Sequence, residues 1–201
     1  KSVNGFAYEQ WPVIKSMNDN QDWKFAPMEW GFAPDSWFGK KLDTREKLAK
    51  WRSGYKDPVK GWISGITTLN AKGEELLLPG KIYNESAFYR RCLIPSPGFY
   101  ESRHLPKIGK QGQELKATET YPYRILPKNK TPWLMAGVWK PWKDAETGEY
   151  VETFAIVTTQ ANALMKLIHN TKMRQPTILP NDLAEEWLFG DLSPERITEI
   201  A

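Results

Sequence analysis

The stretch PWLMAGVWKPWKDAETGEYVETFAIVTT, residues 132–159, decides the fold. Both of its ends are rich in β-branched and aromatic residues, which favour strands. The polar segment between them contains Gly148, so the sequence predicts two strands joined by a hairpin loop. An earlier strand is predicted at residues 7–15, and Pro12 is expected to limit its length. Three further segments predict strands by their composition: residues 23–34, 62–71 and 89–95.

Two segments with helical spacing of apolar residues predict helices. Asp43 is placed to cap a helix at residues 43–51. Thr158 or Thr159 is placed to cap a second helix at residues 159–170. The apolar stripe of this second helix is expected to consist of Leu164, Leu167 and Ile168.

Two more helices are predicted near the C-terminus. The first covers residues 179–190 and ends at Gly190, and the second covers residues 193–200, with Ser193 at the cap and Pro194 at its first position. The elements together predict an α+β fold. We expect a single domain with a curled or barrel-like, mostly antiparallel sheet and a few peripheral helices.

Composition limits the classes of function. The chain has 201 residues, enough for one domain over residues 1–201, and no apolar run approaches the roughly 20 residues of a membrane span. Its net charge of +4 suits a nucleic-acid partner without demanding one, and its ten tryptophans offer rings for core packing or for base stacking. One cysteine and two distant histidines predict neither a disulfide framework nor a zinc site, and no phosphate-binding glycine loop is present.

The single cysteine, Cys92, lies in the segment RRCLIPSPGFYES at residues 90–102. In a strand its side chain shares a face with that of Ile94, so we expect both to be buried, while the neighbouring Arg91 points to the opposite face. A buried unpaired cysteine behaves as a small apolar residue. We therefore favour core packing over a nucleophilic role for Cys92.

Three other residues are candidates for chemistry, each with a plainer alternative. Glu101 follows aromatic residues and is either a general acid with a raised pKa or a solvated carboxylate. His169 ends a predicted helix, as a cap or as an acid–base group. Asn70 either forms a polar turn or holds a substrate oxygen. His104 is expected in an exposed loop.

Six segments, taken together and in order, resemble the SRAP (SOS response-associated peptidase) family. Each alone is a weak signal, but the six are spread over most of the chain and keep the order of the family. The segments are WGFAP (30–34), LNAKGE (69–74), RRCLIPSPGFYE (90–101), MAGVW (135–139), FAIVTTQAN (154–162) and IHNTKMRQPTIL (168–179).

The resemblance implies one α+β domain that binds single-stranded DNA and senses abasic sites. The implied nucleophile is a cysteine at position two of the full-length chain, exposed when the protein removes its own initiator methionine. Its amine and thiol condense with the sugar aldehyde to form a thiazolidine crosslink. The resemblance assigns the supporting roles to Asn70, which positions the cysteine and the sugar, to Glu101, which shuttles protons, and to His169, which acts as acid or base.

The resemblance also implies a DNA-contacting set. Arg174 matches a family arginine, and Lys72 replaces an arginine, keeping its charge but losing the bidentate fork. Trp37 and Phe38 lie where the family places aromatic contacts to the lesion. Asn4 matches an N-terminal motif near the site.

The sequence departs from the family pattern in three ways. No cysteine precedes Cys92, and we expect that the N-terminal segment with the nucleophile is missing from the printed chain. Ser102 stands where many members have tryptophan. Four residues separate His169 from Arg174, where the family has one.

The leading hypothesis is an abasic-site crosslinking protein. We expect it to be a cytoplasmic monomer, nucleoid-associated if the protein is bacterial, with abasic single-stranded DNA as its partner and with no cofactor, metal or membrane. One alternative is a non-covalent single-stranded DNA-binding module that has lost the nucleophile. The other is a hydrolase that uses Glu101 and His169 on a separate peptide.

Overall fold

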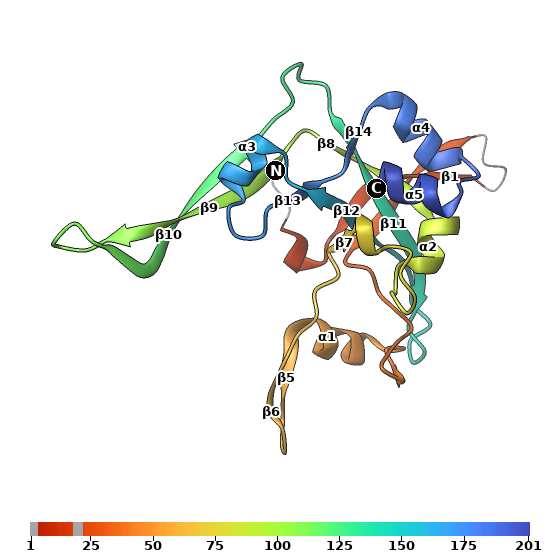
Figure 1. Cartoon of the computed structure of the whole chain (residues 1–201). Helices are drawn as coiled ribbons and strands as arrows, with labels where there is room; N and C mark the ends of the chain where they lie inside the picture. Colours follow the sequence, from red (N-terminus) through yellow and green to blue (C-terminus); the bar gives the residue numbers. More distant parts are fainter. Residues whose placement is uncertain (1–3, 18–21) are drawn as a thin grey trace.

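The computed structural model describes residues 4–17 and 22–201 (Figure 1). Strands β11 (Trp133–Lys143) and β12 (Tyr150–Gln160) form the hairpin predicted from residues 132–159. They pair antiparallel from Gly137↔Ile156 to Lys143↔Tyr150, and Gly148 in their loop has a φ of +74°. Glycine adopts this left-handed conformation without steric cost, so its position in the loop follows directly from the backbone.

This hairpin belongs to a closed barrel. The barrel is completed by β1 (Gln10–Ser16), β2 (Trp23–Trp30) and β8 (Arg91–Ser96), in the order β12-β2-β1-β8-β11 and back to β12. The neighbours are antiparallel except β12 and β2, which run parallel through Thr153↔Glu29. The expected α+β fold with a barrel-like, mostly antiparallel sheet is confirmed.

Further elements surround the barrel. Short strands extend its sheet: β7 (Asn70–Lys72), β13 (Arg174–Pro176) and β14 (Ile178–Leu179). The helices are α1 (Arg45–Ser53), α2 (Asn84–Tyr89), α3 (Ala163–Ile168), α4 (Asn181–Phe189) and α5 (Pro194–Ile200), with 3-10 turns at Gly5–Ala7 and Gly73–Glu75. Three hairpins stand apart from this sheet: β3 (Ser36–Trp37) with β4 (Lys40–Lys41), β5 (Gly54–Asp57) with β6 (Gly61–Ser64), and β9 (Phe99–Ile108) with β10 (Glu114–Ile125).

The strand β8 shows how the sequence builds two cores. Cys92 and Ile94 are buried in the apolar cluster with Met28 and Phe154, whereas Leu93 faces the cluster formed with α4. Alternate residues of a strand point to opposite faces, so the shared burial of Cys92 and Ile94 is as expected. Arg91 points toward α4, where its Nε donates to the Trp187 carbonyl at 2.6 Å.

The helix caps differ in two places from the sequence expectations. Thr44, not Asp43, caps α1 by accepting from the Lys47 amide at 3.3 Å. Asn162, not Thr158 or Thr159, caps α3, because both threonines continue strand β12. At the C-terminus Ser193 caps α5 with Pro194 at its start, and α4 ends before Gly190, as expected.

Two expectations about side chains and strand ends were wrong. Of the expected apolar stripe only Ile168 is buried: Leu164 and Leu167 are each 61% exposed. Met165 is buried with Ile168 instead, because that face of α3 packs against Phe99 and Ile125 at the base of the arm. Pro12 lies inside β1, opposite Pro27, rather than limiting the strand. It is tolerated because β1 pairs with β8 only at later residues, Ile14 and Lys15, so Pro12 lies where β1 has one partner strand.

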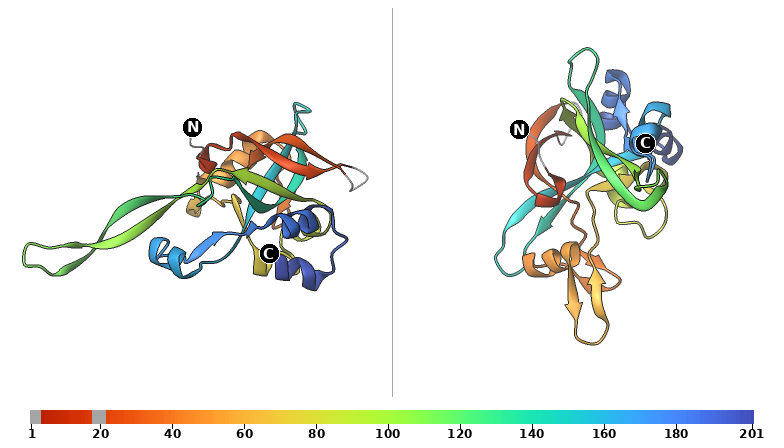
Figure 2. Two further views of the ribbon diagram at one scale, coloured as in Figure 1. Left: turned by 90° about the horizontal axis from the view of Figure 1, so that it is seen from above. Right: turned by 90° about the vertical axis from the view of Figure 1, so that its left-hand side faces the viewer.

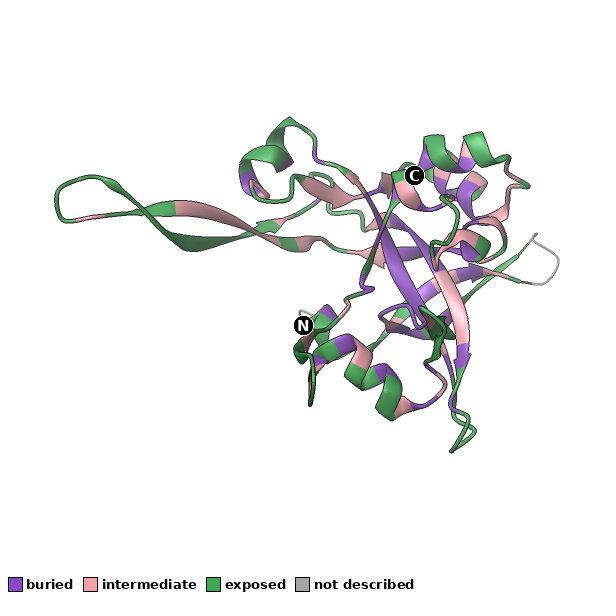
Figure 3. Cartoon of the chain, turned by 60° about the horizontal axis from the view of Figure 1, so that its bottom comes forward, coloured by how far each residue is buried: buried purple, intermediate pink, exposed green. Residues whose placement is uncertain are grey.

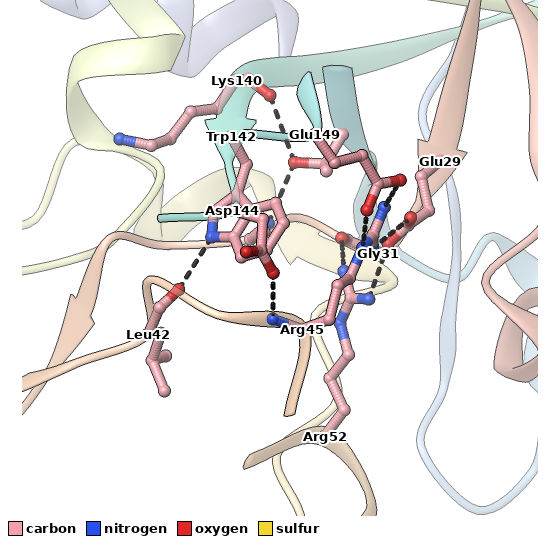
Figure 4. A network of polar contacts seen from close by, with 11 residues as sticks. Glu29, Gly31, Leu42, Arg45, Arg52, Lys140, Trp142, Asp144 and Glu149 are labelled. Atoms are coloured by element: carbon pink, nitrogen blue, oxygen red, sulfur yellow. Dashed lines mark hydrogen bonds and ion pairs between the residues drawn. The ribbon is translucent and has the colours of Figure 1, made fainter. Parts of the chain in front are cut away.

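A buried carboxylate fastens α1 to the barrel (Figure 4). Glu29 of β2 is 7% exposed and accepts from Arg52 Nη1 at 2.6 Å and Arg45 Nη1 at 2.7 Å. Arg52 also donates to the Gly31 carbonyl, and the Arg45 amide donates to Asp144 Oδ2 at 2.7 Å. Two arginines from one helix therefore satisfy a single buried charge on a barrel strand.

The β9–β10 hairpin extends well beyond the rest of the molecule as an arm (Figures 1 and 2). Its residues are exposed or half-buried along their whole length (Figure 3). The sequence predictions did not include this hairpin. Neither face of the arm beyond its base packs on a core, so its sequence lacks the apolar alternation by which strands are recognised.

Candidate active site

Glu101 and His169 meet at the base of the arm. Glu101 lies on β9, and its Oε2 is 3.2 Å from Nδ1 of His169, the residue that follows α3. The side chains are 26% and 15% exposed, so the pair is sheltered but reachable. The other carboxylate oxygen, Oε1, accepts from the Ser102 amide at 3.0 Å. This amide fixes the carboxylate orientation toward the histidine.

A backbone carbonyl defines the tautomer of His169. Its Nδ1 is 2.8 Å from the carbonyl oxygen of Arg174. A carbonyl only accepts, so Nδ1 carries the proton and neutral His169 has an acceptor at Nε2. A carboxylate beside an imidazole whose second nitrogen is an acceptor can move protons to and from a substrate.

The position of His169 follows from how α3 docks on the arm. Asn162 accepts from the Met165 amide at 2.9 Å and starts the helix, and Met165 and Ile168 pack with Phe99 and Ile125 at the base of the arm. The local sequence thus fixes both the start of the helix and the face that it buries.

Asn170, which directly follows His169, forms a second contact between the end of α3 and the arm. Its side chain accepts from the His104 amide at 3.0 Å and donates to the His104 carbonyl at 2.7 Å. His104 is therefore part of β9, not of an exposed loop as expected from the sequence. The pair of bonds holds the α3 end against the arm next to Glu101.

Strand β7 presents Asn70 and Lys72 to solvent while Ala71 between them is buried. Asn70 pairs with Ile156 of β12, at the strand's start rather than in a turn. The side chains of Asn70 and Lys72 lie on one face because residues two apart in a strand point the same way. Lys72 Nζ lies 2.7 Å from Glu75 Oε1.

Arg174 of β13 connects the segment after β7, which contains Glu74, with the loop that contains His169. Its Nη2 donates to Glu74 Oε2 at 2.8 Å and to the Thr158 carbonyl at 2.6 Å, and its Nη1 also pairs with Glu74. The guanidinium beside Glu74 lowers the pKa of that carboxyl. Glu74 and Asn170 were not identified as site residues from the sequence, although both lie in segments that carry the family resemblance.

The remaining predicted contacts lie at different places. Asn4 caps the first 3-10 turn by accepting from the Phe6 amide at 3.1 Å. A Cβ on the next residue, Gly5, would lie 3.1 Å from Leu69 Cδ1, so this segment packs beside the residue before Asn70.

Trp37 packs on Trp51 of α1, with ring centroids 5.5 Å apart, and Phe38 is 91% exposed. Helices α1 and α3 are well separated in Figures 1 and 2, so the aromatic pair is remote from His169. A DNA-contacting role for Trp37 and Phe38 stays a prediction.

Cys92 is remote from this chemistry. It is fully buried inside the barrel, and burial raises the pKa of its thiol far above the ordinary value. A thiol that stays protonated is a poor nucleophile.

Residues 4–17 and 22–201 contain neither a metal-ligand cluster nor a membrane-spanning helix. No group of three or more histidine, cysteine, aspartate or glutamate side chains there is arranged to hold a metal ion. Within the same ranges, every helix is too short or too polar to traverse a bilayer.

Two curated relatives are named as abasic site processing proteins. YoqW from Bacillus subtilis is 31% identical over 146 residues, which is 72% of this chain and 58% of YoqW. HMCES from Gallus gallus is 26% identical over 193 residues, covering 89% of this chain and 49% of HMCES. The chain thus spans about half to three-fifths of the length of these relatives.

Solved structures show the same fold. A protein from Bacteroides thetaiotaomicron superposes with a TM-score of 0.74 at 29% identity, over 98% of this chain and 70% of that one. A phage-related protein from Bordetella bronchiseptica gives a TM-score of 0.62 at 24% identity, over 96% and 71%, which supports the fold alone. The profile of the family described as SOS response associated peptidase (SRAP) matches residues 1–200, so the chain belongs to the SRAP family.

Proposed function

We propose that the protein processes abasic sites in single-stranded DNA by forming a covalent crosslink. The observation that carries the proposal is the Glu101–His169 pair, a sheltered acid–base unit 3.2 Å apart in a family whose members include named abasic site processing proteins. The proposed nucleophile is an N-terminal cysteine upstream of the printed sequence, exposed by removal of an initiator methionine.

The chemistry requires one residue with both an amine and a thiol. The amine adds to the aldehyde of the ring-opened sugar and, with loss of water, gives an imine. The thiol then adds across the C=N bond and closes a five-membered thiazolidine, so the overall reaction releases one water. Only an N-terminal cysteine offers both groups at this spacing.

The described residues suit the proton transfers in this sequence. In this proposal Glu101 protonates the sugar ring oxygen as the ring opens, and Nε2 of His169 accepts or returns protons at the amine. Asn70 offers an amide to the sugar oxygen and to the cysteine. The packing of Gly5 beside Leu69 supports this, because a chain that leads into Asn4 arrives next to Asn70.

The test is a denaturing gel with abasic single-stranded DNA and a chain that carries the native N-terminal cysteine. We expect a denaturant-resistant adduct that disappears when that cysteine is changed to alanine. Binding without any adduct would instead support a non-covalent DNA-binding module. An adduct that persists after the cysteine is removed would contradict the proposed nucleophile.

A further inference from the structure

The arm and the segment directly after it carry the excess positive charge of the chain. Residues 99–130, which form the arm and the segment after it, contain seven lysines and arginines and three glutamates. Their excess of four equals the formal net charge of the whole chain, +4. The remaining sequence is therefore balanced. The projecting ribbon itself, residues 99–125, carries five of these lysines and arginines and all three glutamates, and Lys128 and Lys130 follow directly after it (Figure 2). Such a distribution points to a polyanionic partner at the arm.

The two faces of the ribbon differ in their relation to the active site. In the register of β9 and β10, Tyr123 is opposite Glu101 and Tyr121 is opposite Arg103. These four residues share one face, because directly paired residues lie on the same side of a ribbon and residues two apart in a strand do too. We call them the Glu101 face. The reverse face carries another arginine–tyrosine pair, Arg124 opposite Tyr100.

The Glu101 face combines rings with an incompletely satisfied cation. Tyr121 and Tyr123 are 42% and 40% exposed, so their rings are available to a ligand. Arg103 is half-buried, and its Nε is covered and has no hydrogen-bond partner among the residues the structure describes. The Tyr121 hydroxyl donates to Glu119 Oε2 at 2.7 Å, which holds that ring in place.

We propose that the Glu101 face binds the single strand flanking the reacting nucleotide. Tyr121 and Tyr123 stack on its unpaired bases, and Arg103 pairs with its phosphates. A strand that leaves Glu101 along this face meets both groups in succession. This inference rests on the proposed function for its starting point, while the charge and the rings of the arm are independent of it.

The observations favour a single strand over other partners. A duplex offers phosphates but hides the faces of its bases, so the exposed tyrosines would gain little from it. A second copy of this chain would bring two positively charged arms together, which like-charge repulsion opposes.

The test compares two double variants of the full chain that remove the same residue types. R103A/Y121A removes one cross-strand pair of the Glu101 face, and Y100A/R124A removes the corresponding pair on the reverse face. Fluorescence anisotropy would measure binding to abasic oligonucleotides with a short flank and with a long flank on either side. Circular dichroism and thermal unfolding would check that both variants fold.

We expect R103A/Y121A to weaken binding of a long-flanked strand at least about fivefold, the lower limit for losing one base–aromatic stack. Its affinity for the short-flanked strand should stay at the parent level, and Y100A/R124A should bind both as the parent does. Equal losses in the two variants, or an equal loss for duplex DNA, would overturn the proposal. So would light scattering that shows a dimer abolished by R103A/Y121A.

Failure of the proposed function is separable from failure of this inference. Adduct formation on a short-flanked abasic oligonucleotide tests only the chemistry near Glu101. If no adduct forms but long strands still depend on Arg103 and Tyr121, the flank-binding surface stands without the crosslinking reaction. If adducts form but the affinity for long strands does not depend on Arg103 or Tyr121, the flank-binding proposal is wrong and the proposed function stands.

Discussion

Oε2 of Glu101 lies 3.2 Å from Nδ1 of His169, although the two residues are 68 positions apart in the sequence. The contact joins a strand of the projecting arm to the end of a helix docked on it. The Arg174 carbonyl at 2.8 Å from the same nitrogen fixes Nε2 as the acceptor of the neutral imidazole. We propose that the two groups form one proton-transfer unit, and the first prediction tests it.

In a chain that carries the N-terminal cysteine, E101Q should slow adduct formation roughly 10²- to 10⁴-fold, the usual contribution of a positioned acid–base group. The amide keeps the size of the side chain but cannot exchange a proton. Single-turnover rates on abasic oligonucleotides would measure the effect. The control is E114Q, at an exposed carboxylate of the same arm, which should react at the parent rate. Equal rates for E101Q and the parent would remove Glu101 from the mechanism.

The second prediction concerns competition for Arg174. Glu74 forms an ion pair with the guanidinium of Arg174 and would compete with a phosphate for it, so E74Q should raise affinity for single-stranded DNA, whereas R174Q should lower it. If Arg174 neutralises one phosphate, R174Q should also reduce the slope of log K against log salt by about 0.7. Anisotropy titrations at several salt concentrations would measure both. An unchanged slope in R174Q would show that Arg174 only supports the structure.

The same ion pair has a defined dependence on pH. Arg174 lowers the pKa of Glu74 below its usual value of 4.5. A depressed carboxyl pKa contributes stability that is present above 4.5 and is lost as the pH falls through the lower, folded-state value. The difference in midpoint between the parent and E74Q should therefore shrink as denaturation is measured at increasingly acidic pH. A difference that does not change between neutral and acidic pH would contradict this assignment.

The third prediction concerns the buried carboxylate under α1. E29Q should destabilise the fold by about 3 kcal/mol, because it leaves the buried guanidinium of Arg52 without its countercharge. Urea unfolding followed by tryptophan fluorescence would measure the change. E46Q removes an exposed partner from α1 and is the matched control, expected to lie within about 1 kcal/mol of the parent. Similar losses of unfolding free energy in E29Q and E46Q would mean that the burial of Glu29 does not determine its contribution to stability.

The fourth prediction separates Cys92 from the chemistry. C92A should form adducts at the parent rate once the N-terminal cysteine is present, because Cys92 is sealed in the barrel. Native protein should also react slowly with iodoacetamide at Cys92 and quickly in denaturant. Mass spectrometry of timed samples distinguishes the two. Rapid alkylation of the folded chain at neutral pH would show that the thiol is more accessible than its burial indicates.

The barrel and its hairpin were predictable because their residues carry strong local signals. The apolar runs around Gly148 and the Ser193–Pro194 helix start need no tertiary information. The start of α3 was misplaced because Thr158 and Thr159 have the chemistry of caps but are held in β12 by pairing with β13, which the local sequence does not reveal. Propensity is a weak prior where tertiary contacts compete with it.

The site was predictable only in part, and the joint roles of its residues only through resemblance. Glu101 and His169 were identified as candidates, but their contact depends on α3 docking at the base of the arm. Glu74 and Arg174 are 100 positions apart, and Asn170 and His104 are 66 positions apart. No sequence periodicity predicts contacts between residues so distant in the chain. The arm itself went unpredicted, since a ribbon that buries neither face leaves no alternating pattern in its sequence.

The parallel pairing of β2 with β12 has a consequence for how the protein is made. Glu29 and Thr153 must find each other across more than half of the chain before the barrel closes. Contacts so distant in sequence form late, because the loop-closure entropy must be overcome first. Strands β7 and β13, which carry Asn70 and Arg174, both attach to β12. A nascent chain on the ribosome therefore cannot pair the strand that carries Asn70 until residues 150–160 have emerged, and Arg174 joins this edge only after residues 174–176 have followed.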